Sequence, residues 1–409
     1  VHTINIPNSA NPNIFGEPLE EGDWIGVFYL DDDGNEACGG AGQWEPGPLG
    51  GDPRAVINAY GDDPTTPEKD GFAAGETFRW RMFDCSGWDE YPAGATYDQT
   101  LPNQGQFADF GLSKVTSLEV MFCQYYTLNS GWNSLSSYII PFDADVQNMF
   151  APVVDDLIIL RNLTQIYWPG ENINTIGQLD NGTGYVLKMS ETTDFKICGA
   201  EFANGEVTLD AAGWYYLPVL SECAVDAMEL FGDHMEDIVI VQELIGTQVF
   251  WPDMSVYTLE TLLPGKAYKI KVNNPITLMF PECAARTGQS AATQVNSINT
   301  SWGNVNMTPA TQLVSFKSES LKNLIEGDVI GAFDQAGNLA GYMEVNAATQ
   351  SMVMTLFGDD VTSSAKNGFA EGELISFRML RTQTGDEYIM DVEWDYSMQN
   401  ASGNFNNNT

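Results

Sequence analysis

The stretch GFAAGETFRWRMF at residues 71–83 decides how this chain is organised, because it returns as GFAEGELISFRML at residues 368–380. The two copies lie 297 residues apart (368 minus 71). The same offset relates YGDD at residues 60–63 to FGDD at residues 357–360. Because chance does not keep one register over such a span, these segments belong to a module that occurs twice.

A second pair of repeats lies between the two copies. Gly131-Trp132 recurs as Gly213-Trp214, and the apolar run DLIIL at residues 156–160 recurs as DIVIV at residues 237–241. Lys188 and Lys271 close the two copies of this inner repeat. We therefore expect four modules and one linker rich in Ala, Ser, Thr, Gln and Asn: A at 1–122, B at 123–200, B′ at 201–284, the linker at 285–300, and A′ at 301–409.

Short-range patterns predict a mainly β fold. Apolar and charged side chains alternate over Thr77–Phe83, which indicates a strand with one buried face. Asp32–Asn35 lies between two apolar runs, which predicts a hairpin turn. Apolar residues at helical spacing predict a short helix within Ala144–Phe150. We expect A and A′ to be antiparallel β-sandwiches that flank two small β-rich modules, with one short helix in each.

Charge narrows the classes of partner. The chain has 409 residues, with 56 Asp and Glu against 17 Lys and Arg, for a formal charge of -39. Nucleic acids and anionic membrane surfaces attract clustered cations, so we expect neither as a partner. No apolar run approaches the roughly 18 residues that cross a bilayer, so no membrane insertion is expected. We expect instead self-association into a fibre, contact with neighbouring modules of a longer chain, or binding to a polysaccharide.

The six cysteines include no Cys-x-x-Cys pair, which disfavours a zinc or redox site. We expect disulfides formed in an oxidising, extracellular compartment, with buried free thiols in a cytosolic protein as the alternative. Cysteines at strand edges of the inner modules suggest the pairs Cys123–Cys198 and Cys223–Cys283, which leaves Cys38–Cys85 in module A. Each such loop would stabilise its module by a few kcal/mol on the chain-entropy account. Module A′ has no cysteine.

Catalytic motifs are scarce. The two histidines are His2, near the first residue where we expect loose chain, and His234. The sequence has no nucleophile elbow, metalloprotease helix, P-loop or dinucleotide fingerprint. A glycosidase needs only two carboxylates, which 56 acidic residues supply by abundance alone. We therefore predict no enzymatic activity and no catalytic residues.

Calcium is the one ligand that the motifs suggest. Both outer modules place two aspartates at the start of a loop that is followed by Glu76 or Glu373, and hard cations bind clustered oxygens. The alternative is that these carboxylates cap backbone amides in a turn, as Asp often does. Candidate calcium ligands are Asp62, Asp63, Asp359 and Asp360.

The triplets Tyr167-Trp168-Pro169 and Phe250-Trp251-Pro252 admit two interpretations. Exposed tryptophan faces stack on sugar rings, so Trp168 and Trp251 are candidates for a carbohydrate platform. Both triplets also follow a buried strand, where an aromatic residue that closes the core is expected. The packing interpretation is favoured because both copies keep the surrounding apolar pattern.

The modules resemble repeat units of large secreted and cell-surface proteins of Bacteroidota. The resemblance covers nearly the whole chain and rests on HTINIP at 2–7, GDWIGVF at 22–28, YGDDPTTPEKDGF at 60–72, INTIG at 173–177 and the Tyr-Trp-Pro triplet. It implies export by the type IX secretion route and a role as an adhesin, a fibre or an appendage on an enzyme. It transfers no binding residue, and no terminal sorting domain is recognisable.

Module A′ departs from A in one respect. An offset of 297 takes Leu112 to Thr409, so residues 113–120 of A have no counterpart. We expect either a fragment of a longer protein or a subunit whose last sandwich another chain completes. The favoured function is a subunit of a cell-surface fibre or the stalk of an adhesin, assembling head-to-tail by strand addition. The alternative is a carbohydrate-binding appendage of a secreted polysaccharide-degrading system.

Overall fold

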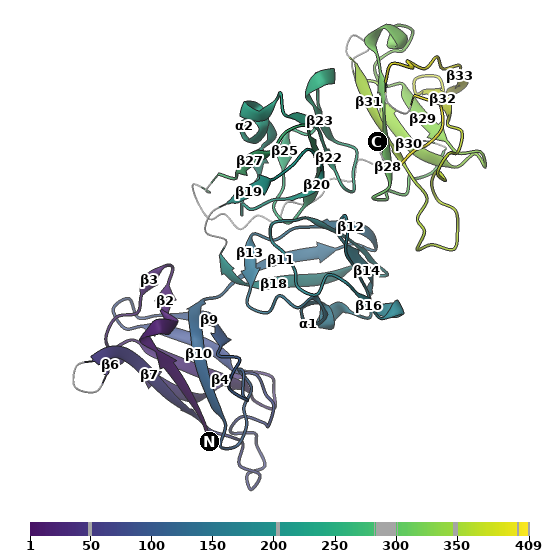
Figure 1. Cartoon of the computed structure of the whole chain (residues 1–409). Helices are drawn as coiled ribbons and strands as arrows, with labels where there is room; N and C mark the ends of the chain where they lie inside the picture. Colours follow the sequence, from purple (N-terminus) through teal and green to yellow (C-terminus); the bar gives the residue numbers. More distant parts are fainter. Residues whose placement is uncertain are drawn as a thin grey trace. The chain divides into compact units, whose positions relative to one another are not determined.

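The computed structural model describes residues 1–47, 51–201, 205–281, 283, 300, 302–346, 351–398 and 401–407. The described residues are mainly β, as predicted, with several antiparallel sheets and two short helices (Figure 1). The chain divides into two compact units. Unit 1 comprises Val1–Gln124, Ile139–Ala144 and Lys196–Phe202, and unit 2 comprises Tyr125–Tyr138, Asp145–Phe195 and Ala203–Thr409. The expected linker at 285–300 lies almost wholly outside the described residues, and the boundaries of four modules stay a prediction.

The N-terminal part of unit 1 is a sheet that folds over itself into two layers, with the order β5-β4-β8-β9-β10-β1-β7-β6. Strand β10 joins the layers, because its first residues pair with β1 and its later residues pair with β9. The pairing of β10 with β1 is parallel, whereas we expected antiparallel strands throughout. The strands are β1 (His2–Pro7), β2 (Asn13–Ile14), β3 (Glu17–Pro18), β4 (Trp24–Leu30), β5 (Glu36–Gln43), β6 (Glu45–Gly47), β7 (Gly51–Ala59), β8 (Arg79–Asp84), β9 (Asp89–Tyr97) and β10 (Leu112–Val120).

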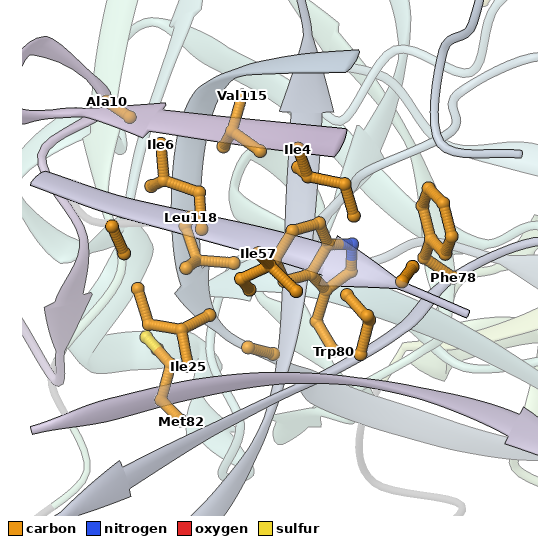
Figure 2. Packing of buried hydrophobic residues seen from close by; sticks show 14 of the residues in the cluster. Ile4, Ile6, Ala10, Ile25, Ile57, Phe78, Trp80, Met82, Val115 and Leu118 are labelled. Carbon is orange, nitrogen blue, oxygen red and sulfur yellow. The ribbon is translucent and has the colours of Figure 1, made fainter. Parts of the chain in front are cut away.

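Strand alternation builds the core of this layered sheet. In β1 and in the first part of β8 every second side chain points inward and is buried, which is the pattern of a strand with one solvent-facing side. The inward side chains of β10 complete the core between the layers. Figure 2 shows these residues meeting between the strands: Ile4, Ile6, Ala10, Ile25, Ile57, Phe78, Trp80, Met82, Val115 and Leu118.

A three-stranded sheet follows along the chain, with the order β11-β18-β13. It contains the disulfide between Cys123 of β11 and Cys198 of β18, which are 75 residues apart. The strands are β11 (Phe122–Leu128), β13 (Ile139–Pro141) and β18 (Thr193–Glu201).

Unit 2 contains two copies of one five-stranded sheet. In B the order is β12-β17-β14-β15-β16, and in B′ it is β20-β26-β22-β23-β24. The bounds are β12 (Gly131–Leu135), β14 (Leu157–Arg161), β15 (Ile166–Trp168), β16 (Ile173–Asn174), β17 (Tyr185–Met189), β19 (Glu206–Leu209), β20 (Gly213–Pro218), β21 (Val225–Asp226), β22 (Ile238–Glu243), β23 (Val249–Trp251), β24 (Val256–Tyr257), β25 (Thr261–Leu262), β26 (Ala267–Val272) and β27 (Ile276–Met279).

Each copy carries one five-residue helix, α1 (Val146–Phe150) and α2 (Ala227–Phe231). A helix this short is unstable in isolation. Asp145 and Asp226 cap the two N-termini through hydrogen bonds from backbone amides. Buried residues on each helix then anchor it to its module, so the predicted helix in B is confirmed.

The two inner modules pack together, as their brief connection suggests. The backbone amides of Ser136 and Gly184 donate to the carbonyls of Gly265 and Tyr216, at 3.0 and 2.8 Å. Gly184 has no room for a side chain, since a Cβ there would lie 2.5 Å from the Cβ of Ala267.

The last module repeats six of the ten strands of the first sheet. Its order is β28-β31-β30-β29-β32-β33, and each strand matches one of β1, β7, β5, β4, β8 and β9. The described residues contain no counterpart of β10. The bounds are β28 (Thr311–Phe316), β29 (Val329–Phe333), β30 (Leu339–Glu344), β31 (Met352–Phe357), β32 (Ser376–Arg381) and β33 (Asp386–Met390).

The segment around Phe405 belongs to the core of A′, although we expected frayed chain near residues 404–409. Phe405 is buried and stacks on Phe369 with ring centroids 5.3 Å apart. Phe107 stacks on Phe72 in the same way in A, at 5.6 Å. Because the neighbouring residues are mostly asparagine, composition alone does not reveal that this phenylalanine is buried.

Candidate functional site

The Gly-Asp-Asp loops of A and A′ have the same internal hydrogen bonds. In A, Asp62 accepts the amide of Asp70, and Asp63 accepts both the amide and the hydroxyl of Thr65. In A′ the corresponding acceptors and donors are the pairs Asp359 with Asn367 and Asp360 with Thr362. These contacts are those of the capping alternative.

The downstream glutamates do not join the aspartates. Glu76 accepts the amide of Ala73 and pairs with Lys69 at 2.8 Å, and Glu373 likewise pairs with Lys366 at 2.6 Å. Over the described ranges, no group of three or more His, Cys, Asp or Glu side chains is arranged to hold a metal ion. Calcium at these loops therefore stays a prediction without a supporting cluster of ligands.

Asp360 instead binds to module B. Its Oδ2 lies 2.7 Å from Nζ of Lys188 and accepts Nε1–H of Trp132 at 2.9 Å. Lys188 also donates to the hydroxyl of Thr362 at 2.8 Å. Burial raises the pKa of this carboxyl group, but the hydrogen bonds from Lys188 and Thr362 outweigh it and hold the pKa below the ordinary value. Asp360 is thus a buried carboxylate that accepts a charge-assisted hydrogen bond from Lys188 and a hydrogen bond from the indole of Trp132.

Module B′ repeats the receiving residues. Trp214 pairs with Lys271 across β20 and β26, just as Trp132 pairs with Lys188 across β12 and β17. Lys269 adds a second ammonium 4.3 Å from the Trp214 ring. Burial, then the positive charges of Arg161 and Lys271, lower the pKa of Lys269 to about 8. Cations therefore gather here in a strongly acidic chain.

The edge of A′ differs from that of A, because none of its described residues form a strand in the place of β10. In A, β9 runs on to Tyr97 because β10 pairs with its second half. In A′, β33 ends at Met390, four residues short of the matching position Trp394 (97 plus 297). Within the described residues β33 pairs only with β32, and β28 pairs only with β31. Two strand edges thus lie open where A has one shared strand.

His2 is buried and ordered, not part of a loose terminus. Its Nδ1 accepts the amide of Ala108 at 3.1 Å, and its Nε2 lies 2.9 Å from the hydroxyl of Ser113. Gln312 holds the same place in A′, where its Oε1 accepts the amide of Asn406 at 2.8 Å.

The structure contains the disulfides Cys123–Cys198 and Cys223–Cys283, as predicted from their strand-edge positions. The predicted pair Cys38–Cys85 is wrong: both thiols are free and exposed. Cys38 stands opposite Phe28, which stands opposite Arg79, and Cys85 lies six residues beyond Arg79. Six residues of strand extend about 20 Å, whereas bridged Cα atoms lie within about 7 Å of each other.

At the first residue of each aromatic triplet, the structure agrees with the packing interpretation. Tyr167 and Phe250 are buried, while Trp168 and Trp251 are half-buried. Each following proline begins a short 3-10 turn that ends the strand. Trp88, which is 81% exposed in the hairpin after β8, is the most exposed tryptophan among the described residues. A sugar platform stays a prediction.

Compared with known protein families, with characterised proteins and with solved structures, the chain shows no match. In the part of the chain that the structure describes, no helix is long and apolar enough to cross a membrane.

The residues that bring modules together, Trp132, Lys188 and Asp360, were matched between repeats by sequence alone. What the sequence did not reveal is that they meet.

Proposed function

We propose that this chain is a non-catalytic, extracellular structural protein, a subunit of a cell-surface fibre or adhesin stalk that assembles head-to-tail. The observation that supports the proposal is that, among the described residues, β28 and β33 each pair with one strand only. In A, β10 pairs with both of the corresponding strands, β1 and β9, and fills the position between them. Strand edges present unpaired N–H and C=O groups, which are a template for pairing with a further strand.

The geometry of A defines what this position accepts. In A the inward side chains of β10, among them Ser113, Val115 and Leu118, are fully buried. A strand that takes the position in A′ would run parallel to β28 and antiparallel to β33, as β10 does to β1 and β9. On β33, Ile389 is 90% exposed, so apolar surface is available at this edge.

An extracellular location is supported by the chemistry of the chain. Disulfides persist in oxidising compartments and are rare in the cytosol. A charge of -39 keeps a repeat protein soluble and disfavours association through unmatched surfaces. The resemblance to repeat modules of secreted Bacteroidota proteins points to the same setting and, through it, to type IX secretion.

The test is the assembly state of the purified chain. We expect species larger than a dimer in sedimentation velocity, growing with concentration, and filaments in negative-stain electron micrographs. Open head-to-tail contacts give such a distribution because a heterologous interface does not close. A single monomer peak that does not change with concentration would contradict the proposal.

A further inference from the structure

The B repeats carry a carboxylate-binding position twice, and one copy is occupied. In B, Trp132 and Lys188 bind Oδ2 of Asp360, while Thr362 occupies Oδ1 and receives a hydrogen bond from Lys188. The side chain of Lys188 is 14% exposed and that of Asp360 is 2% exposed. Val361, between Asp360 and Thr362, is 93% exposed and takes no part in the contact. The recognised motif is therefore Asp-x-Thr.

The second copy has the donors without the acceptor. Trp214 and Lys271 occupy the positions of Trp132 and Lys188 in the sheet. Lys269 is only 8% exposed, and its contact in the described residues is with the Trp214 ring. No carboxylate in those residues pairs with Lys269 or Lys271. A buried ammonium without a counter-ion is costly, so this position favours an anion.

Arg161 strengthens the same field. Its guanidinium acts on Lys269 electrostatically, and its buried Nε has no hydrogen-bond acceptor in the described residues. Arg161 itself lies over the Trp132 ring at 5.7 Å, so its positive charge acts on both copies of the position. A carboxylate is the ligand chemistry that the occupied copy demonstrates.

A free copy of the matching motif lies in module A. Asp63-Pro64-Thr65 has the internal hydrogen bonds of Asp360-Val361-Thr362, with Oδ1 taken by the amide and hydroxyl of the threonine. Asp63 is exposed, and its Oδ2 accepts no hydrogen bond within the described residues. Proline replaces valine at the position that points to solvent, so the difference does not disturb the recognised atoms.

We propose that Trp214, Lys269 and Lys271 of one chain bind the Asp63-Pro64-Thr65 loop of a second copy. This inference rests on the proposed function, because it supplies a contact through which subunits associate. Every copy carries both the loop and its receptor on different surfaces, so the contact is heterologous and propagates from chain to chain. The Asp360 contact is then its intramolecular counterpart.

Two complementary variants test the contact in the full chain. Asp63→Asn removes the ligand charge, and Lys271→Glu reverses the receptor charge. Each variant alone is expected to lose self-association by at least about tenfold in dissociation constant, because a close charge pair is broken. An equimolar mixture is expected to regain the contact once per pair of chains, since each partner retains the half that the other lacks. Sedimentation velocity measures all of these species.

Controls separate this contact from general charge effects and from misfolding. Asp33→Asn makes the same change at another exposed aspartate of A and is expected to assemble like the unmodified chain. Lys271→Gln removes the receptor charge without adding a negative one, and circular dichroism checks that it folds.

The outcomes distinguish the two proposals. If the unmodified chain assembles and both charge variants assemble as tightly as Asp33→Asn, the inference is overturned and the proposed function stands. If the unmodified chain stays monomeric at every concentration, both proposals are overturned. Loss of assembly in each variant with recovery in the mixture supports the inference, and it supports head-to-tail assembly through this contact and not through the strand edges of A′.

Discussion

At the scale of single residues, His2 shows how a side chain can tie two layers together. Its ring lies between Phe78, 5.0 Å away edge to face, and the hydroxyl of Ser113 on β10. Accepting the amide of Ala108 requires the lone pair of Nδ1, so the neutral ring with a proton on Nε2 suits the site. Burial lowers the pKa of His2 below its ordinary value of 6.5.

The lowered pKa makes a prediction about pH. Below pH 6.5 the unfolded chain binds a proton at His2 that the folded chain resists, so the free energy of unfolding falls as the pH drops. His2→Gln should flatten this dependence between pH 7 and pH 5, by up to about 1.4 kcal/mol per pH unit. Glutamine keeps the acceptor, as Gln312 does in A′. Urea denaturation at several pH values measures the slope.

His2→Leu is the comparison that separates titration from hydrogen bonding. It should flatten the pH dependence equally but lower the stability at every pH by about 1–3 kcal/mol, because the amide of Ala108 loses its acceptor. An unchanged slope in His2→Gln would show that another group is responsible.

At the scale of elements, the sequence predicted features that depend on local patterns and missed features that depend on contacts between distant residues. Strand β8 and helix α1 were expected within about two residues, because their periodicity is set by consecutive residues. The parallel pairing of β10 with β1 was missed, since it joins residues more than 100 positions apart. The contact of Trp132 with Asp360, and the orphan charge of Lys269, depend on tertiary packing in the same way.

The disulfides lead to a prediction about stability at the scale of elements. Cys198→Ser should lower the free energy of unfolding by about 4 kcal/mol, because the bridge closes a loop of 75 residues. Reduction should lower it further, because it also opens Cys223–Cys283. Cys38→Ser should change it by less than about 0.5 kcal/mol, since that thiol is exposed and unbridged. Chemical denaturation with and without reductant measures both. Alkylation of the folded, unreduced chain should label two of the six cysteines, Cys38 and Cys85, and an unlabelled chain would mean that these two form a disulfide.

At the scale of the whole molecule, the copies of each repeat share their cores and differ at their edges and contacts. Phe72 with Phe107 and Phe369 with Phe405 stack alike. By contrast, Asp360 is bound where Asp63 is free, Lys269 stands where B has Val186, and β10 has no partner copy in the described part of A′. Duplication of this kind produces matched but unequal surfaces. A chain with unequal ends is suited to ordered association.

The open position in A′ can be tested directly with the strand that fills it in A. A synthetic peptide with the sequence of Leu112–Val120, LSKVTSLEV, should bind the full chain at A′, with its first residues beside Leu313–Ser315. At a hundredfold excess over its dissociation constant, such a ligand raises the free energy of unfolding by about 2.7 kcal/mol. A peptide with aspartate in place of Val115 and Leu118 should not bind, because those side chains point into the core. Fluorescence anisotropy of the labelled peptides measures the difference, and equal binding of both would mean that A′ does not accept a strand in the manner of β10.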